Sequence, residues 1–156
     1  MGSVEFECAE MRTRKHLRKW ISLAVKTWAW QILKGLNYLH GRSPRIIHRD
    51  LNYSNIFVEG NFGILKIGDL GLSCVLGQDG FAYNIVGTPE FMGPELYEEN
   101  CDELVHTYSF GISMLEIITI EIPYSEYNSV AQVYKKVDFG RMPTTLEKVL
   151  DPQVNS

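Results

Sequence analysis

The sequence contains little cysteine and no excess of positive charge. Its three cysteines, Cys8, Cys74 and Cys101, lie at unrelated spacings. An odd number without a CxxC motif or a Cys/His cluster argues against a disulfide scaffold or a zinc site, and favours a reducing compartment. Lys and Arg number 15 against 19 Asp and Glu, a formal net charge of -4. We therefore expect no nucleic-acid partner, because such partners require a basic surface.

Long apolar runs and a secretory leader are also lacking. The most hydrophobic stretch, Phe110 to Pro123, is interrupted by Glu116 and Glu121, whereas a membrane-spanning helix needs about 20 mostly apolar residues. The first residues have no basic region followed by an apolar one, so no signal peptide is expected. The basic run from Arg12 to Lys19 favours a solvated helix face over a groove contact. These absences predict a cytoplasmic protein with no membrane partner.

The composition supplies enough apolar material for one core, with 45% of the residues hydrophobic and 22% charged. Steps of three and four between apolar residues predict a helix over 22–40, ended by Gly41. A second helix over 103–120 is apolar around much of its circumference, which is typical of the centre of a core. A third helix over 128–139 is expected to be capped by Asn128 and ended by Gly140.

Short apolar runs between these helices predict strands. Ile46 and Ile47 form one, and the runs 56–58 and 64–67, joined by a glycine-containing loop, predict a β-hairpin. The segment from Gly71 to Pro94 has neither helical nor strand period. Loops longer than about 15 residues inside a domain are more often functional than accidental. The fold class is therefore mainly α (α+β), with one small hairpin and one long functional loop.

Polar residues gather at the edges of the predicted hairpin. Asp50 and Asn55 flank a tight loop before the first strand, and Asp69 follows the second strand, so all three can converge on one point. An aspartate that accepts a hydroxyl proton, with carboxylate and amide oxygens for a hard divalent cation, is what phosphoryl transfer from a metal-bound nucleotide requires. The alternative for each residue taken alone is that it only occupies a turn, where Asp and Asn are favoured.

The order of the motifs favours the chemical interpretation. His48-Arg49-Asp50 with Asn55, then Asp69-Leu70-Gly71, then Gly93-Pro94-Glu95, is the ordered signature of protein kinases. The chain most resembles the With-No-Lysine (WNK) serine/threonine kinases, especially their plant members. The stretches that carry this resemblance are Lys66-Ile67-Gly68-Asp69-Leu70-Gly71-Leu72, Gly87-Thr88-Pro89-Glu90-Phe91-Met92, Pro94-Glu95-Leu96-Tyr97-Glu98-Glu99, Tyr108-Ser109-Phe110-Gly111 and Ile122-Pro123-Tyr124-Ser125-Glu126.

The resemblance covers about residues 20 to 150 and implies a partial kinase domain over 1–156, namely its C-terminal lobe, with the N-terminal lobe absent. Residues 1–20 are poorly assigned. The segment 22–40 would be helix E, 46–71 the catalytic loop and metal-binding hairpin, and 71–95 the activation segment. The segments 103–120 and 128–139 would be helices F and G.

Roles for individual residues also follow from the resemblance. Asp50 would be the catalytic base, with Asn52 and Thr88 beside it in the catalytic site. Asn55 and Asp69 would bind Mg²⁺ and, with Phe57 beneath the adenine, the cofactor ATP. The substrates would be proteins with Ser or Thr acceptors. Backbone amides near Leu70 and Leu72 would form half of a chloride site, which needs an N-terminal lobe to be complete.

Four departures from the family pattern stand out. Asn52 replaces a Lys that touches the transferred phosphate in most such kinases, although some plant WNK members also have Asn there. His106 replaces an Asp that receives backbone N–H groups of the His48-Arg49 turn, so we expect a loss of charge-assisted bonds and a looser catalytic loop. Asn84 stands where the family carries its activating Ser, and Asp79 where a second Ser is often found. No Gly-rich loop, strand Lys or helix Glu is recognisable upstream.

Three interpretations remain open at this point. The first is an ATP-dependent serine/threonine kinase whose 156-residue chain is truncated and weakly active or inactive alone. The second is a non-catalytic pseudokinase fragment that binds proteins through the surface around Tyr134 and Lys135. The third is a decaying copy without function and with poor stability.

Overall fold

The computed structural model describes residues 3–59, 63–77, 81–82, 85–97 and 102–150, with side chains for those between 22 and 149. Four α-helices, four short strands and three 3₁₀ turns succeed one another along these residues. In chain order they are α1 (Ser3–His40), β1 (Ile46–Ile47), η1 (Tyr53–Asn55), β2 (Ile56–Glu59), β3 (Ile64–Ile67), β4 (Cys74–Val75), η3 (Pro89–Phe91), η4 (Pro94–Tyr97), α2 (Val105–Thr119), α3 (Val130–Asp138) and α4 (Thr145–Leu150).

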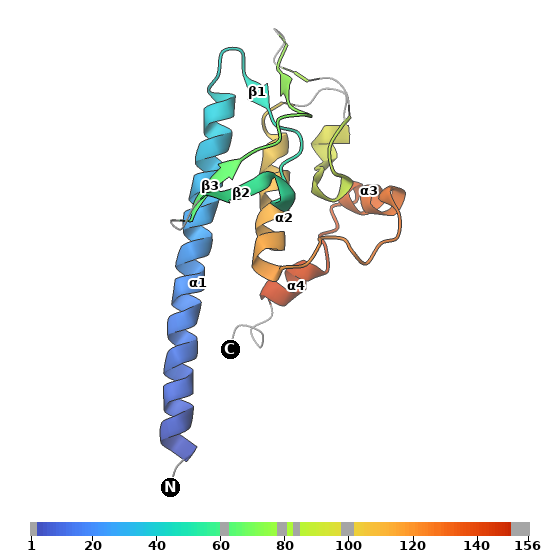
Figure 1. Ribbon diagram of the computed structural model, residues 1–156. Coiled ribbons are helices and arrows are strands. Elements are labelled where there is room, and N and C mark those ends of the chain that lie inside the picture. The colour runs from blue at the N-terminus through green and yellow to red at the C-terminus, as the bar shows by residue number, and fades with distance from the viewer. Residues whose placement is uncertain (1–2, 60–62, 78–80, 83–84, 98–101, 151–156) are drawn as a thin grey trace.

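Helix α1 is longer than the 22–40 segment that its apolar period predicts. It begins at Ser3, and its N-terminal part extends away from the other elements (Figure 1). The charged run from Arg12 to Lys19 therefore lies on helical backbone, and the solvated-face interpretation stays a prediction. The predicted end is correct, because the Gly41 N–H donates to the Asn37 carbonyl at 2.9 Å and closes the last turn.

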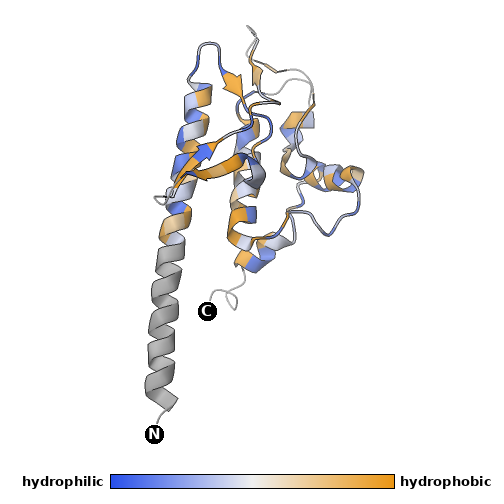
Figure 2. Ribbon diagram, viewed as in Figure 1, coloured by the Kyte–Doolittle hydropathy of each residue, from blue (hydrophilic) through white to orange (hydrophobic). Residues whose placement is uncertain are grey.

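Helix α2 lies within the predicted segment 103–120 and at the centre of the molecule. It contributes one buried residue or more to each of three apolar clusters, and Figure 2 shows hydrophobic residues along it and on the neighbouring hairpin. Val105 packs in the first cluster, Ile112 in the second and Met114 in the third. The helix ends at Ile120, which takes the left-handed conformation with φ 57°.

The predicted hairpin is present and packs against α1. Strands β2 and β3 are antiparallel, with Ile56 opposite Ile67 and Glu59 opposite Ile64. The side chain of Gln31 on α1 fixes this position, because its Oε1 accepts from the Leu65 N–H at 2.8 Å and its Nε2 donates to the Gly63 carbonyl at 3.3 Å. The third apolar cluster fills the space between α1, α2 and the hairpin.

The segment from Gly71 to Pro94 is less irregular than expected. It contains β4, which pairs antiparallel with β1 so that Ile47 lies opposite Cys74. Unlike the Ile46–Ile47 pair, this strand lies in a segment punctuated by glycines such as Gly77, which favoured a loop there. The 3₁₀ turns η3 and η4 follow, and Phe91 and Leu96 of these turns are buried.

The C-terminal elements differ from the prediction in two details. Helix α3 is capped by Ser129 and not by Asn128, since the Ser129 side chain accepts from the Gln132 N–H. It ends before Gly140, which has φ 66°, as predicted. The short helix α4 was not predicted, because its six residues are too few for an apolar period. Within the described part of the chain, no helix combines the length and the apolar character needed to cross a bilayer.

Candidate active site

The site is built on the sharp turn that follows β1. Ile47 and His48 are fully buried, and Arg49 takes the left-handed conformation with φ 65°. The His48 ring fixes the turn from inside, since its Nδ1 accepts from the Asp50 N–H at 3.3 Å and its Nε2 lies 2.8 Å from the Gly68 carbonyl oxygen. Because Nδ1 is an acceptor, the proton of a neutral His48 is on Nε2. This ring therefore joins the turn to the end of the hairpin.

The carboxylate of Asp50 is the most heavily hydrogen-bonded group of the site. Its Oδ1 accepts from the Thr88 hydroxyl at 2.6 Å, from the Thr88 N–H at 3.2 Å and from Asn52 Nδ2 at 3.0 Å. Its Oδ2 accepts from Asn55 Nδ2 at 2.9 Å. Four donors therefore hold one carboxylate in a single orientation, the preorganisation that a catalytic base requires.

Asn52 and Asn55 form a small polar frame around Asp50. Asn52 Oδ1 accepts from the Asn55 N–H at 3.2 Å and caps η1, while its Nδ2 also lies 3.3 Å from the Thr88 hydroxyl. Asn55 Nδ2 donates to the Asp50 carbonyl as well, at 2.8 Å. With its nitrogen committed to Asp50, the amide oxygen of Asn55 is the atom that can bind a cation.

A close approach of two backbone segments places Thr88 beside Asp50. Gly87 has φ 141°, and a Cβ at this position would lie 2.6 Å from the Arg49 carbonyl oxygen. Only glycine allows both the backbone conformation and the contact. The glycine therefore lets the segment before η3 close over the Asp50 turn.

Asp69 and Phe57 lie at the hairpin end of the site. Asp69 takes φ 53°, is exposed, and accepts from the Gly71 N–H through Oδ1 at 3.1 Å. It is tied to the cluster through its neighbour, because the Gly68 N–H donates to the Asn55 carbonyl at 2.9 Å. Phe57 is 54% exposed and its ring lies against Gly68. Hydrogen bonds thus join Asp50, Asn52, Asn55 and Thr88 directly, whereas Asp69 and Phe57 border this group.

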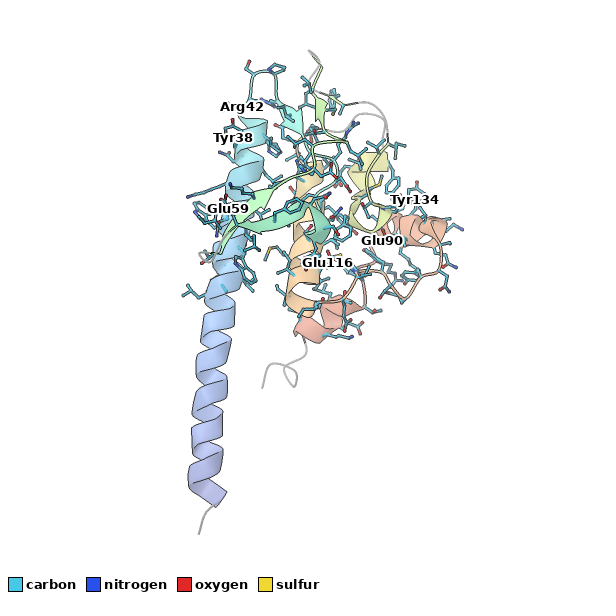
Figure 3. The ribbon with its side chains drawn as sticks, viewed as in Figure 1. Tyr38, Arg42, Glu59, Glu90, Glu116 and Tyr134 are labelled. Atoms are coloured by element: carbon cyan, nitrogen blue, oxygen red, sulfur yellow. The ribbon has the colours of Figure 1, made fainter. Side chains whose placement is uncertain are left out.

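Two residues of α2 support the turn from below. The Ser113 hydroxyl lies 2.7 Å from the Ser109 carbonyl oxygen and 3.2 Å from that of the fully buried Leu51, so the two acceptors share one donor. Glu116 Oε2 accepts from the Tyr53 N–H at 3.3 Å, and Figure 3 shows Glu116 where α2 passes beneath η1. Burial raises the pKa of Glu116, and the Tyr53 bond partly opposes this. The sequence interpretation treated Glu116 only as a break in an apolar run. The signal that could have revealed the role of Glu116 is a carboxylate on an otherwise apolar helix.

His106 keeps contacts that we expected it to lose. Its Nε2 accepts from the His48 N–H at 3.1 Å and from the Arg49 N–H at 3.4 Å. Its Nδ1 lies 2.7 Å from His40 Nε2, a partner that the sequence did not suggest. Burial lowers the pKa of His106 to about 3, with the neighbouring imidazoles of His40 and His48 adding to the effect. The turn therefore retains its acceptor and loses only the negative charge.

Several predicted features lie beyond these contacts. Asp79 and Asn84 fall outside the described residues. Leu70 and Leu72 are exposed, and the Leu72 carbonyl accepts from Arg49 Nε at 2.7 Å. Their role in a chloride site stays a prediction.

Comparison with known proteins decides the family. The family model of the protein kinase domain matches residues 5–155 of this sequence. The chain belongs to the protein kinase family. It is 59% identical over 141 residues to the serine/threonine-protein kinase WNK8 of Arabidopsis thaliana, and 57% identical over 141 residues to the probable serine/threonine-protein kinase WNK10 of the same plant. A third relative, the probable serine/threonine-protein kinase WNK4 of A. thaliana, is 53% identical over 141 residues.

The expected resemblance to plant WNK kinases is thereby confirmed. The alignments cover 90% of this chain for the first two relatives and 88% for the third. They cover only 25%, 27% and 25% of those relatives, so this kinase-family chain spans about a quarter of their length. The assignment of the chain to one lobe of the kinase fold stays a prediction.

Proposed function

We propose that the chain belongs to a catalytic domain that transfers the γ-phosphoryl group of ATP to serine or threonine hydroxyls of proteins. The observation that carries the proposal is the Asp50 carboxylate, held by Thr88, Asn52 and Asn55 at 2.6–3.2 Å. Asp50 accepts the proton of the attacking hydroxyl and orients it in line with the phosphorus. Thr88, whose hydroxyl donates to Asp50, is the residue that we propose contacts the acceptor residue of the substrate.

The donor set suits a hard divalent cation. The amide oxygen of Asn55 and the exposed carboxylate of Asp69 are oxygen ligands of the kind that Mg²⁺ prefers. We propose that these two residues hold Mg²⁺ together with the phosphates of ATP. When bound, the cation neutralises charge on the phosphate oxygens. The exposed ring of Phe57 offers an apolar surface on which the adenine base lies.

Binding of MgATP to the 156-residue chain tests this proposal. We expect a dissociation constant below about 100 μM, about -5.5 kcal/mol, by isothermal titration calorimetry. Asp69→Ala removes a cation ligand and should abolish the heat. Asp138→Ala removes an exposed carboxylate from α3 and should leave the heat unchanged. No heat from the folded wild-type chain, or equal binding by both variants, would refute the nucleotide site. Because no Gly-rich loop or strand Lys is recognisable, we expect slow turnover by this chain alone.

A second candidate function is a non-catalytic protein-binding module, and one surface favours it. Lys135, Lys136, Phe139 and Arg141 line a hollow of about 330 Å³ at the end of α3, and Phe139 is 75% exposed. Tyr134 is less available, because its ring packs edge-on against Tyr97 with centroids 4.5 Å apart. A folded chain that binds no MgATP would favour this function over the first.

A further inference from the structure

Two histidines from separate helices meet behind the Asp50 turn. His40 is the last residue of α1, and His106 lies in the first turn of α2. Their rings are nearly coplanar, with an interplanar angle of 18° and centroids 4.8 Å apart. With His40 Nε2 and His106 Nδ1 only 2.7 Å apart, the rings meet end to end through a hydrogen bond and not face to face.

The contacts permit only one arrangement of protons in this pair. His106 Nε2 accepts from two backbone N–H groups, those of His48 and Arg49, so it carries no proton. A neutral imidazole has its proton on the other nitrogen, which places it on His106 Nδ1. This N–H then donates to His40 Nε2, and the proton of His40 is on Nδ1. Each histidine thereby fixes the tautomer of the other.

A proton added to either ring breaks this arrangement. A protonated His106 would direct a donor at the N–H groups of His48 and Arg49, and both contacts would be lost. A protonated His40 would face the Nδ1–H of His106, and His106 could accept that hydrogen bond only by moving its own proton to Nε2. Protonation of His40 therefore also removes the contacts of His106 with the N–H groups of His48 and Arg49.

The surroundings allow protons to reach the pair. His40, His106, Lys34 and Glu103 line a hollow of about 880 Å³ between α1 and α2. Burial lowers the pKa of His40, the Glu103 carboxylate opposes this, and Arg45, which forms an ion pair with Glu103 at 2.7 Å, adds to the lowering. For His106, the imidazoles of His40 and His48 add to the effect of burial. These groups come from α1, from the residues just before β1 and α2, and from the Asp50 turn.

We propose that His40 and His106 are positioning residues that hold the Asp50 turn only while both imidazoles are neutral, so that acidification releases the turn. The proposal rests on the function proposed above and adds its regulation. Arg49 has φ 65°, a conformation that is strained for a residue other than glycine and persists only where surrounding contacts enforce it. The Arg49 N–H contact with His106 is one of these contacts, and Asp50 is the next residue along the chain.

Nuclear magnetic resonance on the intact chain, without nucleotide, tests the proposal. Imidazole ¹⁵N shifts should show the Nδ1–H tautomer for His106 at about pH 7.5. Between about pH 7.5 and about pH 4, amide protection factors at His48 and Arg49 should fall about tenfold or more, the change expected from losing one hydrogen bond. His40→Gln keeps an acceptor for His106 Nδ1–H but does not titrate, so protection should persist to a lower pH. His106→Gln keeps an acceptor for the turn and should behave in the same way.

Glu103→Gln is the matched control, because it removes a neighbouring carboxylate that is hydrogen-bonded to Arg45 and, among the described residues, to neither imidazole. It should keep the pH response but move it to lower pH, because the Glu103 carboxylate opposes the lowering of the His40 pKa. The proposal is overturned if His106 carries its proton on Nε2 at about pH 7.5, if His40→Gln loses protection as the wild type does, or if Glu103→Gln alone abolishes the response. Because no measurement involves ATP, these outcomes are independent of MgATP binding, which decides the proposed function separately.

Discussion

The hydroxyl of Thr88 donates to Oδ1 of Asp50 at 2.6 Å, across 38 positions of sequence. This contact joins the turn after β1 to the segment before η3, and the Thr88 N–H adds a second bond to the same oxygen at 3.2 Å. The candidate base and the segment expected to face the substrate are therefore one hydrogen-bonded unit. A substitution in the Asp50 turn should therefore alter the segment around Thr88, and the reverse.

Thr88→Val should destabilise the fold, because valine has nearly the shape of threonine but lacks the hydroxyl donor. Hydrogen bonds to charged groups contribute about 1.5–3 kcal/mol, so we expect the free energy of unfolding to fall by about 2 kcal/mol. Urea denaturation measures this. Thr88→Ser keeps the hydroxyl and should lose less than about 1 kcal/mol. Equal losses in the two variants would show that the methyl group, and not the hydrogen bond, matters.

The free energy of unfolding should decrease as the pH falls below about 6.5, because of His106. In the unfolded chain this imidazole takes up a proton near its ordinary pKa of 6.5, whereas in the fold its pKa is lowered to about 3. Between these values the unfolded state binds more protons, so acid favours it. The stabilisation is complete above pH 6.5 and is lost at about 1.4 kcal/mol per pH unit.

Urea denaturation at several values from about pH 7.5 to about pH 4.5 measures this slope. The Gln side chain of His106→Gln cannot titrate, so this variant should take up about one proton fewer on unfolding. Its free energy of unfolding should therefore depend less steeply on pH. His40, whose pKa is also lowered, continues to contribute in that variant. The assignment to His106 is wrong if wild type and His106→Gln have parallel curves.

Gly87→Ala should be among the most damaging single changes in the site. The residue has φ 141°, and the added Cβ would lie 2.6 Å from the Arg49 carbonyl oxygen, so strain and a steric clash combine. We expect a loss on the order of 3 kcal/mol by urea denaturation. Gly111 in α2 is the matched control, since a Cβ there meets nothing within 4 Å. Gly111→Ala should stabilise the fold by about 1 kcal/mol, and a loss of the same size at both positions would contradict the argument.

Local patterns in the sequence predicted the elements that bury an apolar stripe. Helix α2 and the β2–β3 hairpin were found because their periods come from residues that neighbour one another in the chain. The start of α1 at Ser3 was missed, because a charged run such as Arg12 to Lys19 has no apolar period. Contacts between segments that are distant in the sequence leave no such local pattern. The approach of Thr88 to Asp50 was expected only from family resemblance, and the pairing of His40 with His106 was not expected at all.

Asn52→Lys separates the structural role of this residue from its chemical one. Asn52 Oδ1 accepts from the Asn55 N–H at 3.2 Å and its Nδ2 donates to Asp50 at 3.0 Å, so it acts as a cap within the site. Lysine cannot accept this bond, and we expect the free energy of unfolding to fall by about 1 kcal/mol. The same change places a cation beside Asp50, where it would attract phosphate oxygens. Calorimetry should therefore show tighter MgATP binding by a less stable chain. Asn52→Gln adds no charge and should not tighten binding, and tighter binding by both variants would show that the cation is not the cause.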